Sequence, residues 1–122
     1  MKKIVAWVNT YDKKQLLKLT NNIYFATSLK DFEKNLKKNI MPLFSLGLAG
    51  RTLLKSIDII EKHPYLTFYF LDKRVHSWIL QRADWRVRSS ENIEVLVISH
   101  LEAVQISLYP DRVPETLQER RV

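Results

Sequence analysis

The chain has 122 residues, enough for a single domain that buries its own core, and it carries 20 Lys and Arg against 13 Asp and Glu, a formal charge of +7. It contains no cysteine, which excludes disulfides and thiolate chemistry and favours a cytoplasmic protein. No run approaches the roughly 18 apolar residues that a membrane span needs, so we expect no membrane partner.

The first part of the chain alternates short apolar runs with amphipathic stretches. Residues 3–8 form a nearly continuous apolar run, typical of a strand buried on both faces, and Asp12 opens a helix that stops at Asn21. A second strand is predicted at 23–26. Ser28 then begins a turn similar to a capping box in front of a second helix.

The same alternation continues further along. Residues 40–46 predict a third strand, and the helix after Gly50 ends at His63, because the residue before a proline is biased away from helical geometry. The remaining elements are a strand at 66–71, a helix around 75–79 and a strand at 93–98. This order predicts an α/β fold of three layers, in which helices cover both faces of a five-stranded, mainly parallel sheet.

The end of the chain is ambiguous. Residues 101–108 fit a short helix, but the alternation of Val104, Ile106 and Leu108 fits an extra edge strand equally well. We therefore expect one α/β domain over 1–110, followed by a C-terminal tail over 111–122.

Two stretches resemble the receiver domains of two-component signalling. SLKDFEKNLKK (28–38) is similar to the second helix of a receiver, and SLGLAGRTLLKSI (45–57) is similar to the loop and third helix after its phosphorylated strand. The resemblance implies a flavodoxin-like sheet with the strand order 2-1-3-4-5.

The residues that perform receiver chemistry are missing from the matching positions. The acidic pair after the first strand is replaced by Val8-Asn9-Thr10, with Asp12 the nearest carboxylate. No carboxylate lies between Glu33 and Asp58, where the phosphoacceptor is expected, and Ser99-His100 stands in place of the lysine after the fifth strand. The resemblance therefore implies a pseudo-receiver that forms no aspartyl phosphate and needs no cofactor.

Polar residues follow several of the predicted strands, at the edge where open α/β sheets place their sites. These strand-end groups include Asn9, Ser45, Asp72 and His100. Ser45, Asp72 and His100 also follow the chain order of an α/β-hydrolase triad, but the G-x-S-x-G turn around the serine is absent. The three histidines are scattered and have no nearby carboxylate cluster in the sequence, so no metal site is predicted.

The only two glycines open the third predicted helix. Gly47, Gly50, Arg51 and Thr52 form a candidate anion-binding turn, in which backbone N–H groups and the guanidinium face a phosphate. The match to a P-loop fails because Ser45 replaces its first glycine and Arg51 its lysine. The alternative is a tight turn in which the glycines supply positive φ angles.

Residues 73–90 combine cations with aromatic side chains. Arginine with tryptophan is typical of protein interfaces and of surfaces that stack on nucleic-acid bases. The candidates are Arg74, Arg82, Trp85, Arg86 and Arg88. The structural alternative is a helix whose apolar face is buried and whose arginines form a solvated rim.

The sequence leaves three functional hypotheses. The first is a non-catalytic signalling module that binds a partner protein, or a second copy of itself, through a helical face. The second is a polyanion binder that uses residues 73–90 for nucleic acid or residues 45–52 for a phosphorylated small molecule. The third, a small hydrolase, lacks a complete catalytic set.

Overall fold

The computed structural model describes residues 1–45, 50–71 and 94–110, without the side chains of residues 50–54, 57 and 94–97. Its elements in chain order are β1 (Lys3–Trp7), α1 (Thr10–Leu17), β2 (Ile23–Phe25), α2 (Leu29–Lys34), β3 (Ile40–Ser45), α3 (Gly50–Lys62), β4 (Thr67–Leu71), β5 (Glu94–Ile98) and α5 (His100–Leu108).

The strands form a parallel sheet. β1 lies between β2 and β3, with Ile4 opposite both Ile23 and Met41. β4 pairs with the other edge of β3, and β5 pairs in parallel with β4. An α/β fold with a parallel sheet in the order β2-β1-β3-β4 is therefore confirmed.

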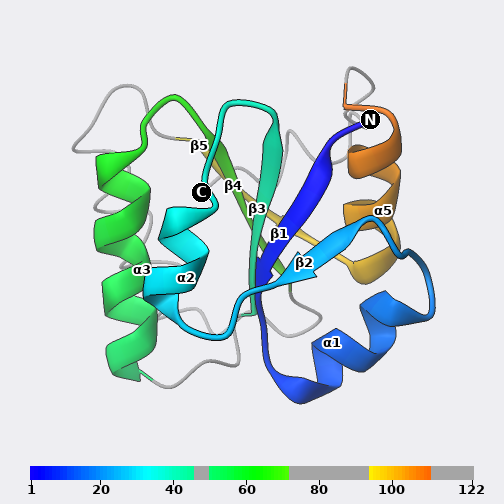
Figure 1. Ribbon diagram of the computed structural model, residues 1–122, viewed down its shortest axis with the longest axis horizontal. Helices are drawn as coiled ribbons and strands as arrows, with labels where there is room; N and C mark the ends of the chain where they lie inside the picture. The colour runs from blue at the N-terminus through cyan, green and yellow to red at the C-terminus, as the bar shows by residue number, and fades with distance from the viewer. Residues whose placement is uncertain (46–49, 72–93, 111–122) are drawn as a thin grey trace.

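Helices cover both faces of the sheet (Figure 1). On one face, α1 and α5 contribute Leu16 and Ile106 to a core that alternate strand residues such as Ile4 and Leu43 complete. On the other face, α2 and α3 contribute to a second core, which contains Phe32, Ile59, Ile60, Phe44 and Phe68. The continuous apolar strands follow from this arrangement, because both of their faces are buried.

The helix starts are set by side-chain caps. Asn9 caps α1 by accepting the N–H of Asp12, so the helix begins at Thr10 rather than at the predicted Asp12. Ser28 caps α2 as expected, because its hydroxyl accepts the N–H of Asp31. α3 ends at Lys62, before His63 and Pro64, as the proline predicted.

The alternative of an extra edge strand over 104–108 is wrong. Residues 100–108 form α5, whose N-cap Ser99 and N3 residue Glu102 make a reciprocal capping box. The box satisfies two N–H groups that have no partner within the helix, and Ala103, Val104 and Ile106 are buried against the sheet. Helical packing therefore prevails over the local alternation of apolar residues.

Several predicted features lie outside the described residues. They are the helix around 75–79 and the tail at 111–122. Within the ranges that the structure describes, no helix is both long and apolar enough to cross a membrane.

Candidate functional site

The polar cluster of this fold lies at the carboxyl edge of the sheet. The chain leaves β1 toward β2 on one side and later returns to place β3 on the other side, so a topological switch point lies between β1 and β3. Ligands of open α/β sheets bind outside the strand ends at such a point. Asn9 follows β1, Ser45 ends β3 and His100 begins α5 after β5. Three of the four predicted strand-end residues are thus brought to this edge.

Asp12 joins these residues into one network. Its Oδ2 accepts a hydrogen bond of 2.5 Å from the Ser45 hydroxyl, and its Oδ1 lies 2.7 Å from Nε2 of His100. The backbone N–H of Asn9 donates to the Ser45 hydroxyl oxygen over 2.9 Å. Ser45 therefore accepts one hydrogen bond and donates one, and the two oxygens of the carboxylate serve different partners.

The start of α1 explains why Asp12 points inward. Asn9 is the N-cap, and its side chain holds the N–H of Asp12, which is the third helical residue. A carboxylate in the first turn of a helix is also stabilised by the helix dipole. The cap and the dipole therefore fix this side chain beside the end of β3.

The network is largely closed to solvent. Ser45 is fully buried, and Asp12 is 8% exposed. The side chain of His100 is 12% exposed, and the ring of Tyr11 meets it edge-on at a centroid distance of 6.2 Å. A buried carboxylate is tolerated only when hydrogen bonds or opposite charges compensate for its lost hydration, and here both oxygens have donors.

The contact with Asp12 determines which nitrogen of the His100 imidazole carries the proton. Because Nε2 of His100 faces a carboxylate, we assign the proton to that nitrogen, which leaves Nδ1 as the acceptor in the neutral ring. The network therefore fixes one tautomer and one orientation of His100.

The hypothesis of a hydrolase triad built on Ser45 and His100 is wrong. In such a triad the imidazole lies between the hydroxyl and the carboxylate and takes the proton of the nucleophile. Here the carboxylate of Asp12 lies between Ser45 and His100, and the hydroxyl donates to it. Asp72, the predicted acid, lies outside the described residues.

The glycine turn is only partly described. Gly50, Arg51 and Thr52 form the first turn of α3, and Gly47 lies outside the described residues. The alternative of a tight turn with positive φ angles stays a prediction, because the turn at 46–49 lies outside the described residues. The candidate anion site keeps the position that the sequence assigned to it, at a helix start.

The arginine and tryptophan candidates also lie outside the described ranges. They are Arg74, Arg82, Trp85, Arg86 and Arg88. The proposed interface over residues 73–90 therefore stays a prediction.

Two of the histidines lie beside a carboxylate in the folded chain. His100 faces Asp12, and Nε2 of His63 lies 3.1 Å from Oε2 of Glu33. Nδ1 of His63 also lies 3.0 Å from the hydroxyl of Tyr65. Among the described residues, no three His, Cys, Asp or Glu side chains gather as a metal site would require.

The sequence prediction missed Asp12 as a site residue. A signal was present, because an asparagine followed three residues later by an acid is a helix-start pattern, and here it directly follows a strand. Starting α1 at Asn9 would have placed Asp12 in the first turn, at the carboxyl edge of the sheet.

Comparison of the chain with protein-family models, with curated proteins and with solved structures found no match.

Proposed function

We propose that the chain is a non-catalytic signalling module, similar to a receiver domain that cannot be phosphorylated, and that it binds a partner protein through α1 and α5. The observation that carries this proposal is the state of Ser45. It ends β3, where a receiver has its acceptor, yet it is fully buried and its hydroxyl donates to Asp12. A group in that state is closed to a phosphodonor.

The arrangement of the elements supports the receiver-like part of the proposal. The strand order β2-β1-β3-β4-β5 is the order that the resemblance implies. The pairing of α1 with α5 on one face and of α2 with α3 on the other follows from right-handed crossovers in such a sheet. A fold can host many functions, so the binding role rests on the surface rather than on the topology.

The α1/α5 face, which we define by Tyr11, Leu17, Leu101 and Leu108, supports the protein-binding part. These side chains are 43% to 56% exposed, although they belong to helices that pack on the sheet. α1 and α5 are in contact, and Tyr11 lies against His100, next to Leu101. Large apolar side chains on neighbouring helices are typical of surfaces that protein partners cover.

The first test concerns phosphorylation. The chain is incubated with acetyl phosphate and Mg²⁺, and its intact mass is measured, with an active receiver domain as the positive control. We expect no added phosphoryl group. A stoichiometric, hydroxylamine-sensitive addition would show an aspartyl phosphate and would overturn the proposal.

The second test concerns the α1/α5 face. A partner captured by the immobilised chain is identified, purified and titrated against Leu101→Asp and against Tyr65→Asp, which changes an exposed apolar residue beyond α3. We expect Leu101→Asp to weaken binding about tenfold or more, as hot-spot changes do, and Tyr65→Asp to have little effect. Equal effects of the two variants would contradict the assignment of this face.

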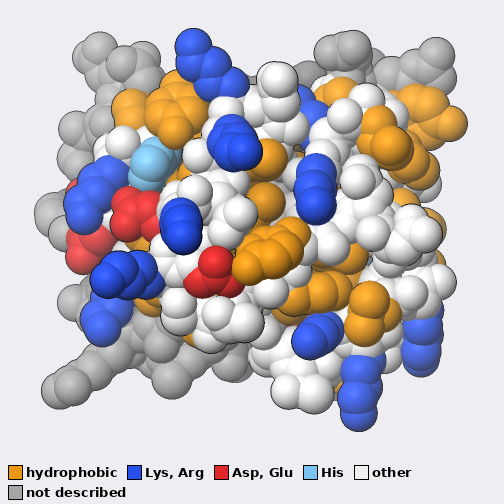
Figure 2. Space-filling view, viewed as in Figure 1, with side chains coloured by type: hydrophobic (Ala, Val, Ile, Leu, Met, Phe, Trp, Pro, Cys, Tyr) orange, Lys and Arg blue, Asp and Glu red, His pale blue; other side chains and the backbone are white. Residues whose placement is uncertain are grey.

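Titration with an oligonucleotide at several salt concentrations tests the polyanion alternative. Figure 2 shows Lys and Arg side chains spread over the visible face, among acidic, apolar and uncharged atoms, rather than gathered in one patch. A nucleic-acid binder should lose affinity steeply as salt rises, because binding releases counterions. If an oligonucleotide bound with such a slope and Leu101→Asp left that binding unchanged, the polyanion function would replace the one proposed.

A further inference from the structure

At the amino edge of the sheet, a histidine lies between a phenol and a carboxylate. Nδ1 of His63 lies 3.0 Å from the hydroxyl of Tyr65, and Nε2 lies 3.1 Å from Oε2 of Glu33. The two aromatic rings meet edge-on, with their centroids 5.7 Å apart. The order is therefore hydroxyl, imidazole, carboxylate, in which the ring connects a nucleophile to the group that orients it.

A tight turn after α3 brings the histidine and the tyrosine together. The N–H of Leu66 donates to the carbonyl of His63 over 3.1 Å, and Pro64 occupies the second position of this turn, which suits its fixed φ angle. The N–H of His63 donates to the carbonyl of Ile60 over 3.2 Å. Because Ile60 and Leu66 are buried in the core beneath α3, the turn is anchored on both sides.

The carboxylate of Glu33 determines which nitrogen of His63 carries the proton. An ionised carboxylate can only accept, so we assign the proton to Nε2, which leaves the lone pair of the neutral ring on Nδ1. The hydroxyl of Tyr65 is then the donor in its bond to Nδ1. The phenol proton is therefore aimed at a base, and the imidazolium formed by its transfer would face the carboxylate.

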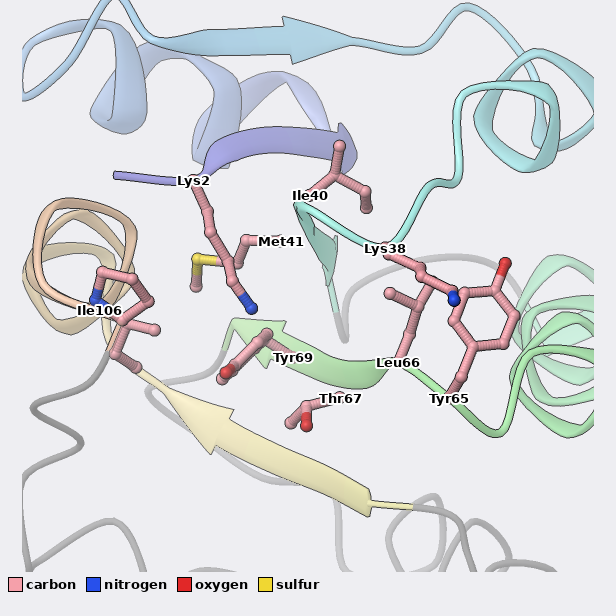
Figure 3. Close-up of a pocket in the computed structure, with 10 residues that line it drawn as sticks. Lys2, Lys38, Ile40, Met41, Tyr65, Leu66, Thr67, Tyr69 and Ile106 are labelled. Carbon is pink, nitrogen blue, oxygen red and sulfur yellow. The ribbon is translucent and has the colours of Figure 1, made fainter.

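The phenol is accessible, whereas the base is mostly covered. Tyr65 is 54% exposed and the side chain of His63 is 19% exposed. Tyr65 borders the hollow drawn in Figure 3, where its side chain leaves the segment between α3 and β4 and its hydroxyl is directed away from Tyr69. A compound in solution can therefore reach the oxygen while the imidazole is in place to take the proton.

We propose that Tyr65 is a base-assisted nucleophile and a modification site that accepts an acyl group from an activated acyl donor. The oxygen attacks the carbonyl carbon as its proton passes to Nδ1 of His63, so a C–O bond forms. The bond from the carbonyl carbon to the leaving group then breaks, and the leaving group takes its electron pair and the proton held by His63. The products are a tyrosyl ester, the protonated leaving group and a neutral imidazole.

The acyl class follows from what the base contributes. A neutral hydroxyl must lose its proton as it bonds to a carbonyl carbon, so an acceptor within hydrogen-bond distance speeds this attack. Glu33 is a positioning residue, because it touches only the imidazole. The site lies on the side of the sheet that α2 and α3 cover, opposite the α1/α5 face, so its test does not depend on the proposed partner binding.

Tyr11 supplies an internal control within the same chain. It is 56% exposed, and its ring meets that of His100 at 72°, the same angle as between Tyr65 and His63. Within the described ranges, the Tyr11 hydroxyl forms no hydrogen bond to that imidazole, whose Nε2 faces Asp12. Tyr11 therefore matches the exposure and the aromatic neighbour of Tyr65 without the geometry for proton transfer.

The test measures acetylation of the full chain by N-acetylimidazole at about pH 8, where an ordinary imidazole is neutral. Peptide mapping by mass spectrometry gives the rate at each tyrosine, and removal by hydroxylamine identifies the product as an ester. We expect Tyr65 to react at least about tenfold faster than Tyr11, toward the lower end of what general-base catalysis contributes. Equal rates at the two tyrosines would overturn the proposal.

Substitution of the base distinguishes assistance from simple exposure. His63→Phe keeps an aromatic ring beside Tyr65 but removes the proton acceptor, so the rate at Tyr65 should fall to within about twofold of that at Tyr11. Urea unfolding checks that the variant is folded, and the rate at Tyr11 in the same sample reports any general change in reactivity. A folded His63→Phe chain that kept the wild-type ratio of the two rates would rule out His63 as the base.

The role of Glu33 has a spectroscopic readout besides the rate. We expect the imidazole ¹⁵N shifts of His63 to show the Nε2–H tautomer in the wild type and a mixture in Glu33→Gln, because an amide can also donate to Nε2. The rate at Tyr65 relative to Tyr11 should fall about threefold or more, since the other tautomer cannot accept the phenol proton. Wild-type shifts and a wild-type ratio in Glu33→Gln would contradict the positioning role.

Discussion

The carboxylate of Asp12 and the imidazole of His100 are 88 positions apart in the chain and 2.7 Å apart in space. Their contact joins the start of α1 to the start of α5, and the bond from Ser45 connects the same carboxylate to the end of β3. Because these side chains are nearly closed to solvent, each depends on the others for its hydrogen bonds. The network of Asp12, Ser45 and His100 therefore connects three elements at the carboxyl edge, and its members should be coupled energetically.

Removal of the Asp12 carboxylate tests how much the network stabilises the fold. Asp12→Ala leaves the hydroxyl of Ser45 and Nε2 of His100 without their acceptor, so we expect the free energy of unfolding to fall by about 1–3 kcal/mol. Urea unfolding measures the change. Lys14→Ala, an exposed position on the same helix, should stay within about 0.5 kcal/mol of the wild type. A variant Asp12→Ala as stable as the wild type would show that the network contributes nothing to the free energy of unfolding.

A double-mutant cycle isolates the contact between Asp12 and His100. We expect a coupling energy of about 0.5–3 kcal/mol between Asp12→Ala and His100→Ala, as found for residues that share a hydrogen bond. The comparison cycle pairs Asp12→Ala with Phe32→Leu, whose side chain belongs to the other core. That pair should be additive within about 0.5 kcal/mol. Additivity in both cycles would contradict a direct interaction.

The capping box of α5 fixes the start of this helix, where His100 faces Asp12. Ser99→Ala removes the acceptor for the N–H of Glu102 and should lower the free energy of unfolding by about 0.5–2 kcal/mol. Ser99→Asn should recover most of this loss, because asparagine is also a good N-cap. Urea unfolding of the three proteins measures both effects. Equal losses in the two variants would mean that the cap is not what stabilises this helix.

A second network around Asp31 predicts acid sensitivity. The N–H of Thr27 and the hydroxyl of Tyr24 donate to this carboxylate over 2.9 Å and 2.7 Å. These bonds, that of Thr27 first, hold the pKa of Asp31 below its ordinary value of 3.8. The unfolded chain therefore binds the proton at higher pH than the folded chain, so the stabilisation is present above 3.8 and is lost as the pH falls through the lowered pKa.

Substitution of the carboxylate should flatten this dependence. We expect Asp31→Asn to lose less stability than the wild type between about pH 5 and about pH 2, measured as the shift of the urea midpoint. Tyr24→Phe keeps the bond from Thr27, the largest cause of the lowered pKa, and should retain most of the wild-type slope. An Asp31→Asn profile parallel to that of the wild type would assign the acid sensitivity to other groups.

The sheet could be predicted from the sequence because its signals are local. Strands buried on both faces need continuous apolar runs, and the turns between them are marked by Asn22, Ser28 and Pro64. Asn9, Ser45 and His100 could be assigned to one edge, because parallel strands end together. The sequence left open the choice between helix and strand for 104–108, and burial against the sheet decided it.

The site could be predicted only as a set of separate residues. Its chemistry depends on the direction of Asp12, which follows from a helix start two positions earlier than predicted. With the correct start, the carboxylate lies between Ser45 and His100 and excludes their direct contact. The facing of every helical side chain depends on where the helix begins, so the predicted start at Asp12 gave no direction for its carboxylate.

The core between the sheet and α2 offers a final test of the fold. The ring of Phe44 lies 4.6 Å from that of Phe32, 5.2 Å from that of Phe70 and 6.0 Å from that of Phe68, measured between centroids, and it is fully buried. Phe44→Ala opens a cavity among these rings and should cost about 3–5 kcal/mol in urea unfolding, while Phe44→Leu should cost less. Leu19→Ala, at a position 44% exposed, provides the comparison and should cost less than about 1 kcal/mol. Similar losses for Phe44→Ala and Leu19→Ala would mean that the side of β3 facing α2 is not the core of the domain.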